Sequence, residues 1–472
     1  MVNSAILSDT DTICAIATAG GRGSVGIVRV SGPATLEIAK QITGTELQPR
    51  HAHFCNFLNE KNITLDNGIA LLFPAPNSFT GEDVLELQGH GGNHVLQLVL
   101  DRVIALGARQ ARPGEFSERA FLNYKIDLVQ AEAIADLIDA QSSEAARSAM
   151  RTLQGDFSAI IHRLVERLTV LRVNVEAAID FTDEDIDVLG TTGVAKSLDE
   201  ICLLLQDTLK QAQQGSILKE GLRVVIAGKP NAGKSSLLNK LAGEDKAIVT
   251  DIPGTTRDIL NVHLDLGGLP LHVFDTAGLR TSNDVVEQEG VRRAQAAMLD
   301  ADRILLVVDA SEKDAELPVD KLLKDLGLDV DSDGISNGQV QKLTLLHNKA
   351  DLIGAAQSDP DSVQINGQEI PRFYVSALTG AGLDLLRKHL REQAGFHPGN
   401  EGVFAARKRH LAALHDAQGF MQAANQQLQD QGALELLAED LRLAQKALAR
   451  ITGEFTSDDL LGEIFSSFCI GK

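Results

Sequence analysis

The segment Gly228–Ser235, which reads Gly-Lys-Pro-Asn-Ala-Gly-Lys-Ser, constrains the fold of this chain more than any other feature. It follows the apolar run Leu222–Ala227 and precedes Ser236–Leu241, so we expect a strand, a loop and a helix in that order. Glycines let backbone N–H groups turn toward one anion, and the dipole at a helix N-terminus also favours negative charge. The pattern predicts a phosphate-binding loop in which Lys234 contacts the β- and γ-phosphates of a nucleoside triphosphate and Ser235 binds magnesium.

Composition limits what surrounds this loop. The 472 residues are enough for about three domains. The net charge of −21 argues against a free-standing, non-specific nucleic-acid binder, although it leaves room for a local basic patch or a basic partner. No apolar run approaches the ~20 residues that span a bilayer, and Met1–Thr10 lacks the pattern of a signal peptide. Four cysteines without a CxxC pair indicate reduced thiols and a cytoplasmic location; they are Cys14, Cys55, Cys202 and Cys469.

The character of the chain changes along its length. The first part alternates short apolar runs with turn-rich stretches, which indicates mixed α/β structure; the runs are Ile13–Ala17, Gly26–Val30 and Val84–Leu87. From Ala120 to Phe181 there is one glycine and no proline, and apolar residues recur at helical spacing, as they do again from Ala405 to Ile451. Two stretches, Gln211–Ser216 and Gly395–Gly402, suggest linkers around the nucleotide-binding part.

These changes predict a multidomain α/β plus α fold. We expect an N-terminal α+β domain over residues 1–119, a first helical part over 120–215, a P-loop domain over 216–395 and a second helical part over 396–472. The simplest interpretation is one helical domain interrupted by the nucleotide domain, because the termini of a domain often lie close together at its surface. Two separate helical bundles are the alternative.

Further motifs select the base. Asp275–Gly278 follows the apolar run Leu271–Phe274, as a magnesium- and γ-phosphate-sensing segment should. Asn348–Asp351 follows Leu343–Leu346, and a carboxylate at Asp351 can accept hydrogen bonds from N1–H and the exocyclic amine of guanine. Adenine has no such pair of donors. With a segment that would close over the base, Ser376, Ala377 and Leu378, the set predicts GTP rather than ATP.

The loop between these motifs concerns hydrolysis. Thr250–Asp258 is rich in hydroxyls and lies at the position of a first switch, where Thr256 should reach magnesium. Many related GTPases orient the attacking water with a glutamine after Gly278, but here that residue is Leu279. The acidic stretch Asp284–Glu289 is a candidate for positioning the water. No arginine finger is evident in the switches, although Arg257 is a candidate for one, and a monovalent cation held by Asn231 and first-switch oxygens could supply the positive charge instead.

Two other patterns are less informative than they first look. Gly21–Gly26 spells the GxGxxG dinucleotide fingerprint, but the residues that follow predict a strand, whereas the fingerprint must open a helix. The cluster Asp180–Asp187 is read as a solvated acidic loop rather than a metal site.

Taken together, the motifs resemble the MnmE (TrmE) family of tRNA-modification GTPases, and the resemblance extends beyond the nucleotide domain. Its signatures are similar to Asn77–Asp83, Ala111–Leu122 and the chain end Phe468–Lys472. The resemblance implies an N-terminal folate-binding domain that dimerises, a central helical domain and an inserted Ras-like P-loop G domain. It also implies G domains that pair across a homodimer when potassium is present.

The resemblance further implies roles for individual residues. The GTP-binding positions are Asn231, Ala232, Gly233, Lys234, Ser235, Ser236, Thr250, Asp251, Ile252, Pro253, Gly254, Thr255, Thr256, Asp275, Thr276, Ala277, Gly278, Asn348, Lys349, Asp351, Ser376, Ala377 and Leu378. The magnesium ligands are Ser235 and Thr256, and the potassium ligands Asn231, Thr250, Ile252 and Thr255. Glu287 corresponds to a glutamate that acts in hydrolysis. The folate-binding positions are Arg29, Glu86, Lys125 and Lys472.

The resemblance also implies a function that the protein carries out together with a partner protein. Members work with a flavoprotein partner of the MnmG type and place an aminomethyl or carboxymethylaminomethyl group on C5 of the wobble uridine of certain tRNAs. A reduced folate (5,10-methylene-tetrahydrofolate or a formyl analogue) supplies the one-carbon unit. Cys469 is then a candidate catalytic thiol, because the apolar residues Ile464–Phe468 before it favour a docked tail. Tail anchoring and shaping of the folate site are the alternatives. A purely regulatory GTPase, for instance in ribosome assembly, is the competing class of function.

Overall fold

The computed structural model describes residues 11–140, 142–180, 193–244, 261–275, 298, 301–312, 321–322, 340–355, 359–365, 368–394, 396, 403–429, 434–454, 458–466 and 468–471. The chain divides into two compact units. The first comprises residues 1–135, 152–205 and 413–472, and the second residues 136–151 and 206–412. Each unit is therefore built from segments that are distant in the sequence. The domain boundaries expected from the sequence stay a prediction.

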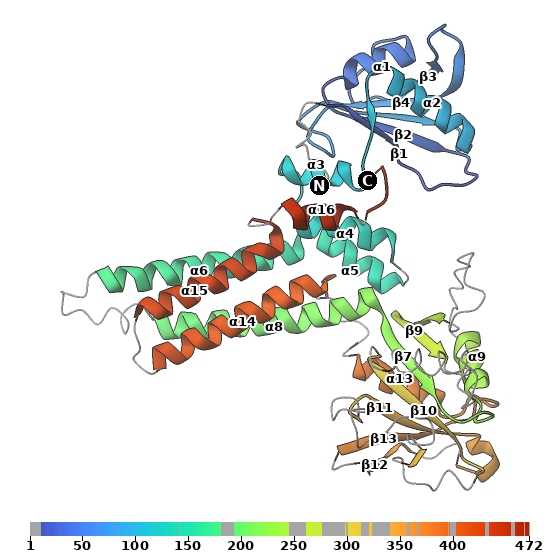
Figure 1. Cartoon of the computed structure of the whole chain (residues 1–472), viewed down its shortest axis with the longest axis vertical. Coiled ribbons are helices and arrows are strands. Elements are labelled where there is room, and N and C mark those ends of the chain that lie inside the picture. Colours follow the sequence, from blue (N-terminus) through green and yellow to red (C-terminus); the bar gives the residue numbers. More distant parts are fainter. Residues whose placement is uncertain are drawn as a thin grey trace, which may run out of the picture. The chain divides into compact units, whose positions relative to one another are not determined.

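The first unit begins with a six-stranded sheet in the order β3-β4-β5-β2-β1-β6 (Figure 1). Its strands are β1 (Ile13–Ile16), β2 (Gly26–Ser31), β3 (His53–Leu58), β4 (Thr64–Phe73), β5 (Val84–Gly89) and β6 (Arg109–Gln110). Helices α1 (Thr35–Thr43) and α2 (Asn93–Ala105) pack on one face, where they cover Val28 and Val30. Because side chains alternate along a strand, Arg29 lies on the opposite face. The three strands expected here from the sequence are confirmed, and Gly21–Gly26 leads into β2, as predicted, rather than into a helix.

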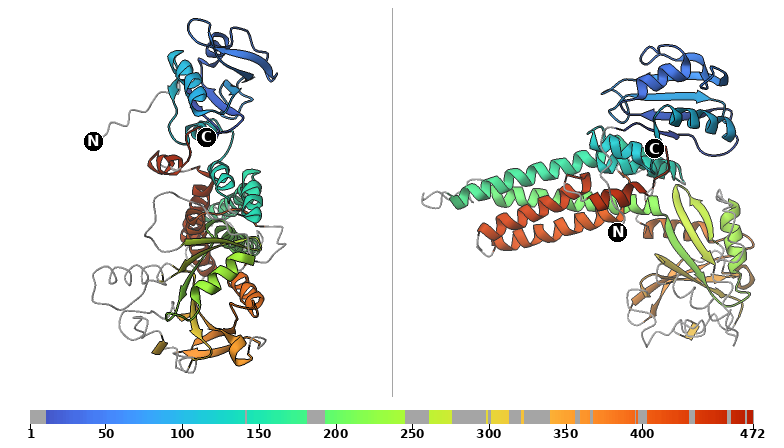
Figure 2. Two further views of the ribbon diagram at one scale, coloured as in Figure 1. Left: turned by 90° about the vertical axis from the view of Figure 1, so that its right-hand side faces the viewer. Right: turned by 45° about the horizontal axis from the view of Figure 1, so that its top comes forward.

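Helices of the first unit come from both sides of the nucleotide-binding region. They include α3 (Glu115–Leu122), most of α4 (Leu128–Ile138), α6 (Asp156–Asp180), α15 (Leu434–Thr452) and α16 (Asp458–Ser466). Helices α6 and α15 run side by side (Figures 1 and 2). Arg172 of α6 donates a hydrogen bond of 2.8 Å to Gln445 of α15, and Gln445 donates one of 3.0 Å to Thr169. This packing favours one interrupted helical domain over two separate bundles.

The helix that leads to the nucleotide-binding part is longer than the sequence suggested. Helix α8 (Val194–Glu220) continues through Gln211–Ser216, where we expected a linker, and that expectation is wrong. The helix ends at Gly221, whose φ of 72° lies in the left-handed region that glycine adopts without strain. Besides the last part of α8, the second unit contains most of α5 (Ser143–Leu153) and the start of α14 (Lys408–Gln429).

The second unit contains a seven-stranded sheet in the order β12-β13-β11-β10-β7-β9-β8. Its strands are β7 (Leu222–Ala227), β8 (Asn261–Leu266), β9 (Leu269–Asp275), β10 (Arg303–Asp309), β11 (Leu343–Asn348), β12 (Asp361–Ile365) and β13 (Gln368–Tyr374). The central strands are parallel. Helices α9 (Lys234–Glu244) and α13 (Leu383–Gln393) pack on the same face, against Val224 and Ile226. Ligands of such sheets bind outside the carboxyl ends of the parallel strands, so the loops after β7, β10 and β11 form the candidate site.

Within the described residues, no helix is both long enough and apolar enough to cross a membrane.

Candidate functional site

The loop after β7 has the backbone geometry that a phosphate requires. Helix α9 begins at Lys234, and the loop before it contains three residues with positive φ: Gly228 (150°), Asn231 (64°) and Gly233 (90°). A Cβ at Gly228 would lie 2.2 Å from the carbonyl oxygen of Val307 in β10, so only glycine fits there. The loop therefore wraps closely around the start of α9, where backbone N–H groups and the helix dipole favour an anion.

The ammonium group of Lys234 is already placed at this loop. Its side chain is buried, and Nζ donates hydrogen bonds of 2.7 Å to the carbonyl of Gly228 and 2.8 Å to that of Lys229. Ser235 and Ser236, in the first turn of α9, are exposed, as is Asn231. This arrangement gives a fixed positive charge beside accessible hydroxyls, which fits a magnesium-bound polyphosphate.

Asn348 ties the phosphate-binding loop to the predicted base-recognition segments. It is 1 % exposed; its Nδ2 donates a hydrogen bond of 2.9 Å to the carbonyl of Ala232, and its Oδ1 accepts one of 3.0 Å from the N–H of Ala377. A Cβ at Gly233 would lie 2.1 Å from the same Nδ2. The buried Asn348 amide thus links the phosphate-binding loop, at Ala232, to the predicted base-recognition segment, at Ala377.

The other predicted base contacts surround Asn348. Asp351 lies in the short 3-10 helix η2 (Ala350–Ile353) and is partly exposed, so its carboxylate remains accessible. Ser376 is fully buried and accepts a hydrogen bond of 3.1 Å from the N–H of Thr379, which shapes the loop that follows β13. Leu378 is 81 % exposed at the rim of that loop. The structure thus brings the described residues that the sequence predicts to bind GTP, which follow β7 and β13 or lie at and after the end of β11, to one edge of the sheet.

An additional residue at this edge, Asp309, was missed by the sequence analysis. It is the last residue of β10 and forms an ion pair with Lys349. Burial alone would raise the pKa of the Asp309 carboxyl, but hydrogen bonds from Lys349 and Ser311 outweigh burial and lower it. The sequence did contain a signal for Asp309, because an acidic residue at the carboxyl end of an apolar strand had already drawn attention to Asp275.

Several predicted residues lie outside the described residues, and their roles stay predictions. They are Thr250, Asp251, Ile252, Pro253, Gly254, Thr255, Thr256, Arg257, Thr276, Ala277, Gly278, Leu279, Glu287 and Lys472. The acidic cluster Asp180–Asp187 also lies outside the described residues, except for the backbone of Asp180. For Asp275, at the end of β9, the structure describes only the backbone.

A second polar site lies on the open face of the N-terminal sheet. Arg29 of β2 donates hydrogen bonds of 3.1 Å and 2.9 Å to Glu86 of β5, its partner across the strands. The guanidinium lies 5.9 Å from the ring centre of Phe79 and 5.8 Å from that of Phe116. Lys125 is exposed, and its stem passes so close to Gly81 that a Cβ at that glycine would lie 3.3 Å from the Lys125 Cδ. Arg29 and Glu86, both predicted from the resemblance, are therefore in direct contact.

The C-terminal tail reaches the same face. Phe465 and Phe468 are buried beside Leu128, which docks the end of the chain as the apolar pattern predicted. Beyond them, Cys469 accepts a hydrogen bond of 3.3 Å at its carbonyl from the N–H of Gly114, and the carbonyl of Gly471 accepts one of 3.5 Å from Arg29. The Cys469 residue is exposed although the backbone around it is held. An exposed thiol therefore lies two residues before Gly471, whose carbonyl contacts Arg29.

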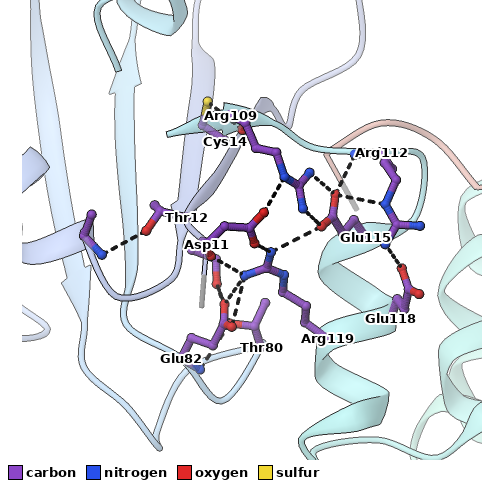
Figure 3. A network of polar contacts seen from close by, with 12 residues as sticks. Asp11, Thr12, Cys14, Thr80, Glu82, Arg109, Arg112, Glu115, Glu118 and Arg119 are labelled. Atoms are coloured by element: carbon purple, nitrogen blue, oxygen red, sulfur yellow. Dashed lines mark hydrogen bonds and ion pairs between the residues drawn. The ribbon is translucent and has the colours of Figure 1, made fainter. Parts of the chain in front are cut away.

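A network of charged side chains fixes helix α3, which carries the docking residue Gly114 at its N-cap (Figure 3). Glu115, 2 % exposed, pairs with both Arg109 and Arg119, and Arg119 also pairs with Asp11 and Glu82. Burial alone would raise the pKa of the Glu115 carboxyl, but its hydrogen bonds to Arg109 and to the N–H of Arg112 lower it. The sequence analysis did not predict this network, because its members come from separate segments.

The strand order, the phosphate-binding loop after β7 and the Asn-Lys-Ala-Asp segment after β11 define a P-loop GTPase. Comparison with known families refines this class. Residues 12–125 match the family described as the N-terminus of the GTP-binding protein TrmE, and residues 128–469 match the MnmE helical domain. The chain belongs to the MnmE family of tRNA modification GTPases.

Curated relatives match over nearly their whole length. A tRNA modification GTPase MnmE from Hydrogenovibrio crunogenus is 55% identical over 466 residues, which is 98% of this chain and 99% of the relative. The protein of the same name from Proteus mirabilis is 54% identical over 467 residues, 99% of this chain and 100% of the relative. Among solved structures, the G domain of the T. maritima FeoB iron transporter is a weaker likeness. It is 24% identical over 37% of this chain and 98% of that chain, with a TM-score of 0.27.

Proposed function

We propose that this chain is a potassium-stimulated GTPase that acts as a homodimer with a flavoprotein partner of the MnmG type. In the proposed reaction, the complex installs an aminomethyl or carboxymethylaminomethyl group at C5 of the wobble uridine of certain tRNAs. The observation that carries the proposal is the second site on the N-terminal sheet, where Arg29 contacts both Glu86 and the docked tail. A purely regulatory GTPase needs no such site.

The nucleotide site would hold GTP through residues of three loops. Lys234 would neutralise the phosphates, and Asp351 would accept from the guanine edge. Ser235 and Thr256 would hold magnesium, which neutralises charge on the phosphates; the exposed Ser235 at the first turn of α9 fits that role. The hydrogen bonds of Asn348 to Ala232 and Ala377 would keep a constant distance between the base and phosphate pockets.

Hydrolysis would depend on residues beyond the phosphate-binding loop. The residue after Gly278 is a leucine, which has no polar group to orient water, so Glu287 is the proposed substitute. Asn231 is exposed and its backbone is left-handed, with a φ of 64°; it would hold potassium with Thr250, Ile252 and Thr255. The cation would supply positive charge where other GTPases use an arginine.

The N-terminal site would hold a reduced folate, which supplies the one-carbon unit. The donor set fits this ligand. The cations of Arg29, Lys125 and Lys472 suit the carboxylates of a folate, and Glu86 suits the amino edge of its pterin ring. Phe79 is 37% exposed and adds an apolar surface for a ring. Cys469 would act as a nucleophile toward the uracil ring or would hold an intermediate.

Folate binding separates this proposal from a regulatory GTPase. Equilibrium dialysis with 5-formyl-tetrahydrofolate should show binding to the wild-type chain and a loss of about tenfold or more for Arg29→Ala. Lys40→Ala is the matched control, because Lys40 forms an exposed ion pair with Glu46 in the same sheet domain and should bind folate normally. No measurable affinity in the wild type would favour the regulatory alternative.

The cation proposal has its own test. The GTPase rate and the association of G domains are measured in potassium and in sodium, with a transition-state mimic present for the association experiment. We expect both to be larger in potassium. Equal behaviour in the two salts would remove the proposed role of Asn231.

A further inference from the structure

Arg29 is contacted by three segments that are distant from one another in the sequence. Its guanidinium lies 5.9 Å from the ring centre of Phe79, in the loop between β4 and β5, and 5.8 Å from that of Phe116, in α3. It also donates a hydrogen bond of 3.5 Å to the carbonyl of Gly471 in the tail. Phe116 is fully buried, whereas Phe79 is 37% exposed. Phe79 is therefore the one of the two rings that a ligand can reach, and its position depends on the loop that carries it.

Glu82 fastens that loop to both neighbouring elements (Figure 3). Its carboxylate accepts a hydrogen bond of 2.6 Å from the hydroxyl of Ser31 in β2 and two of 3.1 Å from Nη1 of Arg119 in α3. The hydroxyl of Thr80 lies 2.7 Å from that of Ser31, and because the single proton of the Ser31 hydroxyl goes to Glu82, Thr80 is the donor. Asn123, after α3, donates a hydrogen bond of 2.7 Å to the carbonyl of Thr80. The loop is thus tied to a strand on one side and to a helix on the other.

Stability alone gives a weak reason for a charged pair at this position. Arg119 is 9% exposed and already pairs with Asp11 and Glu115. A further ion pair taken out of water adds little net stability, because the loss of hydration offsets much of its attraction. What the pair does supply is a defined position. Glu82 accepts from β2 and from α3 at once, so the loop cannot shift relative to either element without breaking a charge-assisted hydrogen bond.

We propose that Glu82 is a positioning residue for the reduced folate, because it holds the loop in the place where Phe79 flanks the Arg29 guanidinium. The inference rests on the proposed folate site and adds to it a residue that acts through Phe79 rather than on the ligand. A cation beside aromatic rings is attracted to them, which restricts its rotamers before the ligand arrives. A guanidinium that is already ordered loses less freedom when a folate carboxylate binds, so the affinity is higher.

The first test compares two glutamates in similar surroundings. The side chains of Glu82 and Glu118 are both 19% exposed, and each pairs with an arginine, at 3.1 Å and 3.0 Å respectively. In Glu82→Gln the amide nitrogen would face a donor, either Ser31 or Arg119, so the loop is released on one side. Binding of 5-formyl-tetrahydrofolate to the full chain should weaken about tenfold, as equilibrium dialysis measures. Glu118→Gln is the matched control: it breaks a pair with Arg112, outside the loop, and should bind folate normally.

A second test separates positioning from a general loss of stability. Phe79→Leu removes the ring and should also weaken folate binding, and adding Glu82→Gln should weaken it no further, because Glu82 acts through that ring. The chain contains no tryptophan, so Phe79→Trp introduces a single fluorescent reporter into the loop. Quenching of this tryptophan by acrylamide should rise about threefold when Glu82→Gln is added and stay unchanged when Glu118→Gln is added.

Each outcome decides the inference. Wild-type affinity in Glu82→Gln, an equal loss in Glu118→Gln, unchanged quenching, or effects that multiply in the double variant would each overturn it while leaving the folate proposal intact. Should Glu82→Gln not fold, Thr80→Val removes the hydroxyl that binds Ser31 and should weaken folate binding about threefold; an unchanged affinity there also overturns the inference. If the wild-type chain binds no reduced folate, the folate proposal itself fails and the inference fails with it, whatever the quenching shows.

Discussion

The nucleotide site and the tail site are built in contrasting ways. In the G domain, the phosphate loop follows β7, Asn348 ends β11 and Ser376 lies two residues beyond β13, so the fold of the sheet alone brings them to one edge. On the N-terminal sheet, Arg29 meets the carbonyl of Gly471, 442 residues away in the sequence. The first site is made of consecutive motifs, and the second exists only once the chain end has docked.

This difference predicts how each site fails. A substitution in a local motif should affect nucleotide binding directly and leave the rest of the chain folded. A substitution at the tail site should act through docking, so that the thiol of Cys469 becomes mobile before anything unfolds. The N-terminal site is accordingly the more sensitive one to changes that do not touch a ligand.

The largest effect is expected at the phosphate loop. Lys234→Ala removes the buried ammonium that lies against the carbonyls of Gly228 and Lys229 and should lower GTP affinity and kcat/KM by about a thousandfold. Asn239→Ala, an exposed position on the same helix, is the control and should retain both. Titration with a fluorescent GTP analogue measures the affinity. If Lys234→Ala also changed the labelling rate of Cys469, the two sites would not be independent.

The next effect concerns the base. Asp351→Asn replaces an acceptor by an amide and should reduce GTP affinity by about a hundredfold while xanthosine triphosphate becomes the better ligand. Competition between the two nucleotides measures the change. Unchanged preference for GTP would remove the assignment of the guanine edge to Asp351.

The features that could be predicted from the sequence are those of local motifs, and the features that could not be predicted depend on contacts between distant segments. The strand before Gly228, the helix after it and the segment around Asn348 were all predicted, because each depends on a short stretch of chain. Asp309 was missed because its significance depends on β10 lying beside β11, which no local pattern states. Arg29 and Glu86 were named only through the family resemblance. The end of helix α8 was predicted too early, because Gln211–Ser216 is polar in sequence although it lies within the helix.

Tail docking can be tested with two glycines that both have a positive φ. Gly114 has a φ of 67°, and a Cβ there would lie 2.5 Å from the carbonyl oxygen of Phe465. Gly107 has a φ of 108°, but a Cβ there meets nothing within 4 Å. Gly114→Ala should therefore undock the tail and raise the rate of Cys469 modification by a thiol reagent about tenfold, while Gly107→Ala introduces backbone strain alone. Equal rates in both variants would show that strain, rather than the clash with the tail, is responsible. GTP binding should be unchanged in both.

The last difference between the two regions is their acid sensitivity. His347 and His389 are 5% and 9% exposed within the G domain, and burial, followed by the nearby positive charge of Arg372 and Arg303 respectively, lowers the pKa of each imidazole to about 4. In the unfolded chain, histidine has a pKa of about 6.5, so between pH 6.5 and pH 4 the unfolded chain binds more protons and stability falls with falling pH. The loss should be about 2 kcal/mol per imidazole between pH 7 and pH 5.

The N-terminal sheet domain should lose stability only at a lower pH than the G domain. Its network depends on carboxylates such as Glu115, whose pKa is lowered, so its contribution is lost only as the pH falls below the usual carboxylate range. Calorimetry of the nucleotide-free chain at pH 7 and pH 5 should show one transition moving down and the other nearly fixed. His389→Gln keeps a polar group within reach of Thr344, which lies 3.2 Å from Nε2, but cannot take up a proton. The variant should remove about half of the pH dependence of the moving transition, and an unaltered slope would mean that another group titrates there.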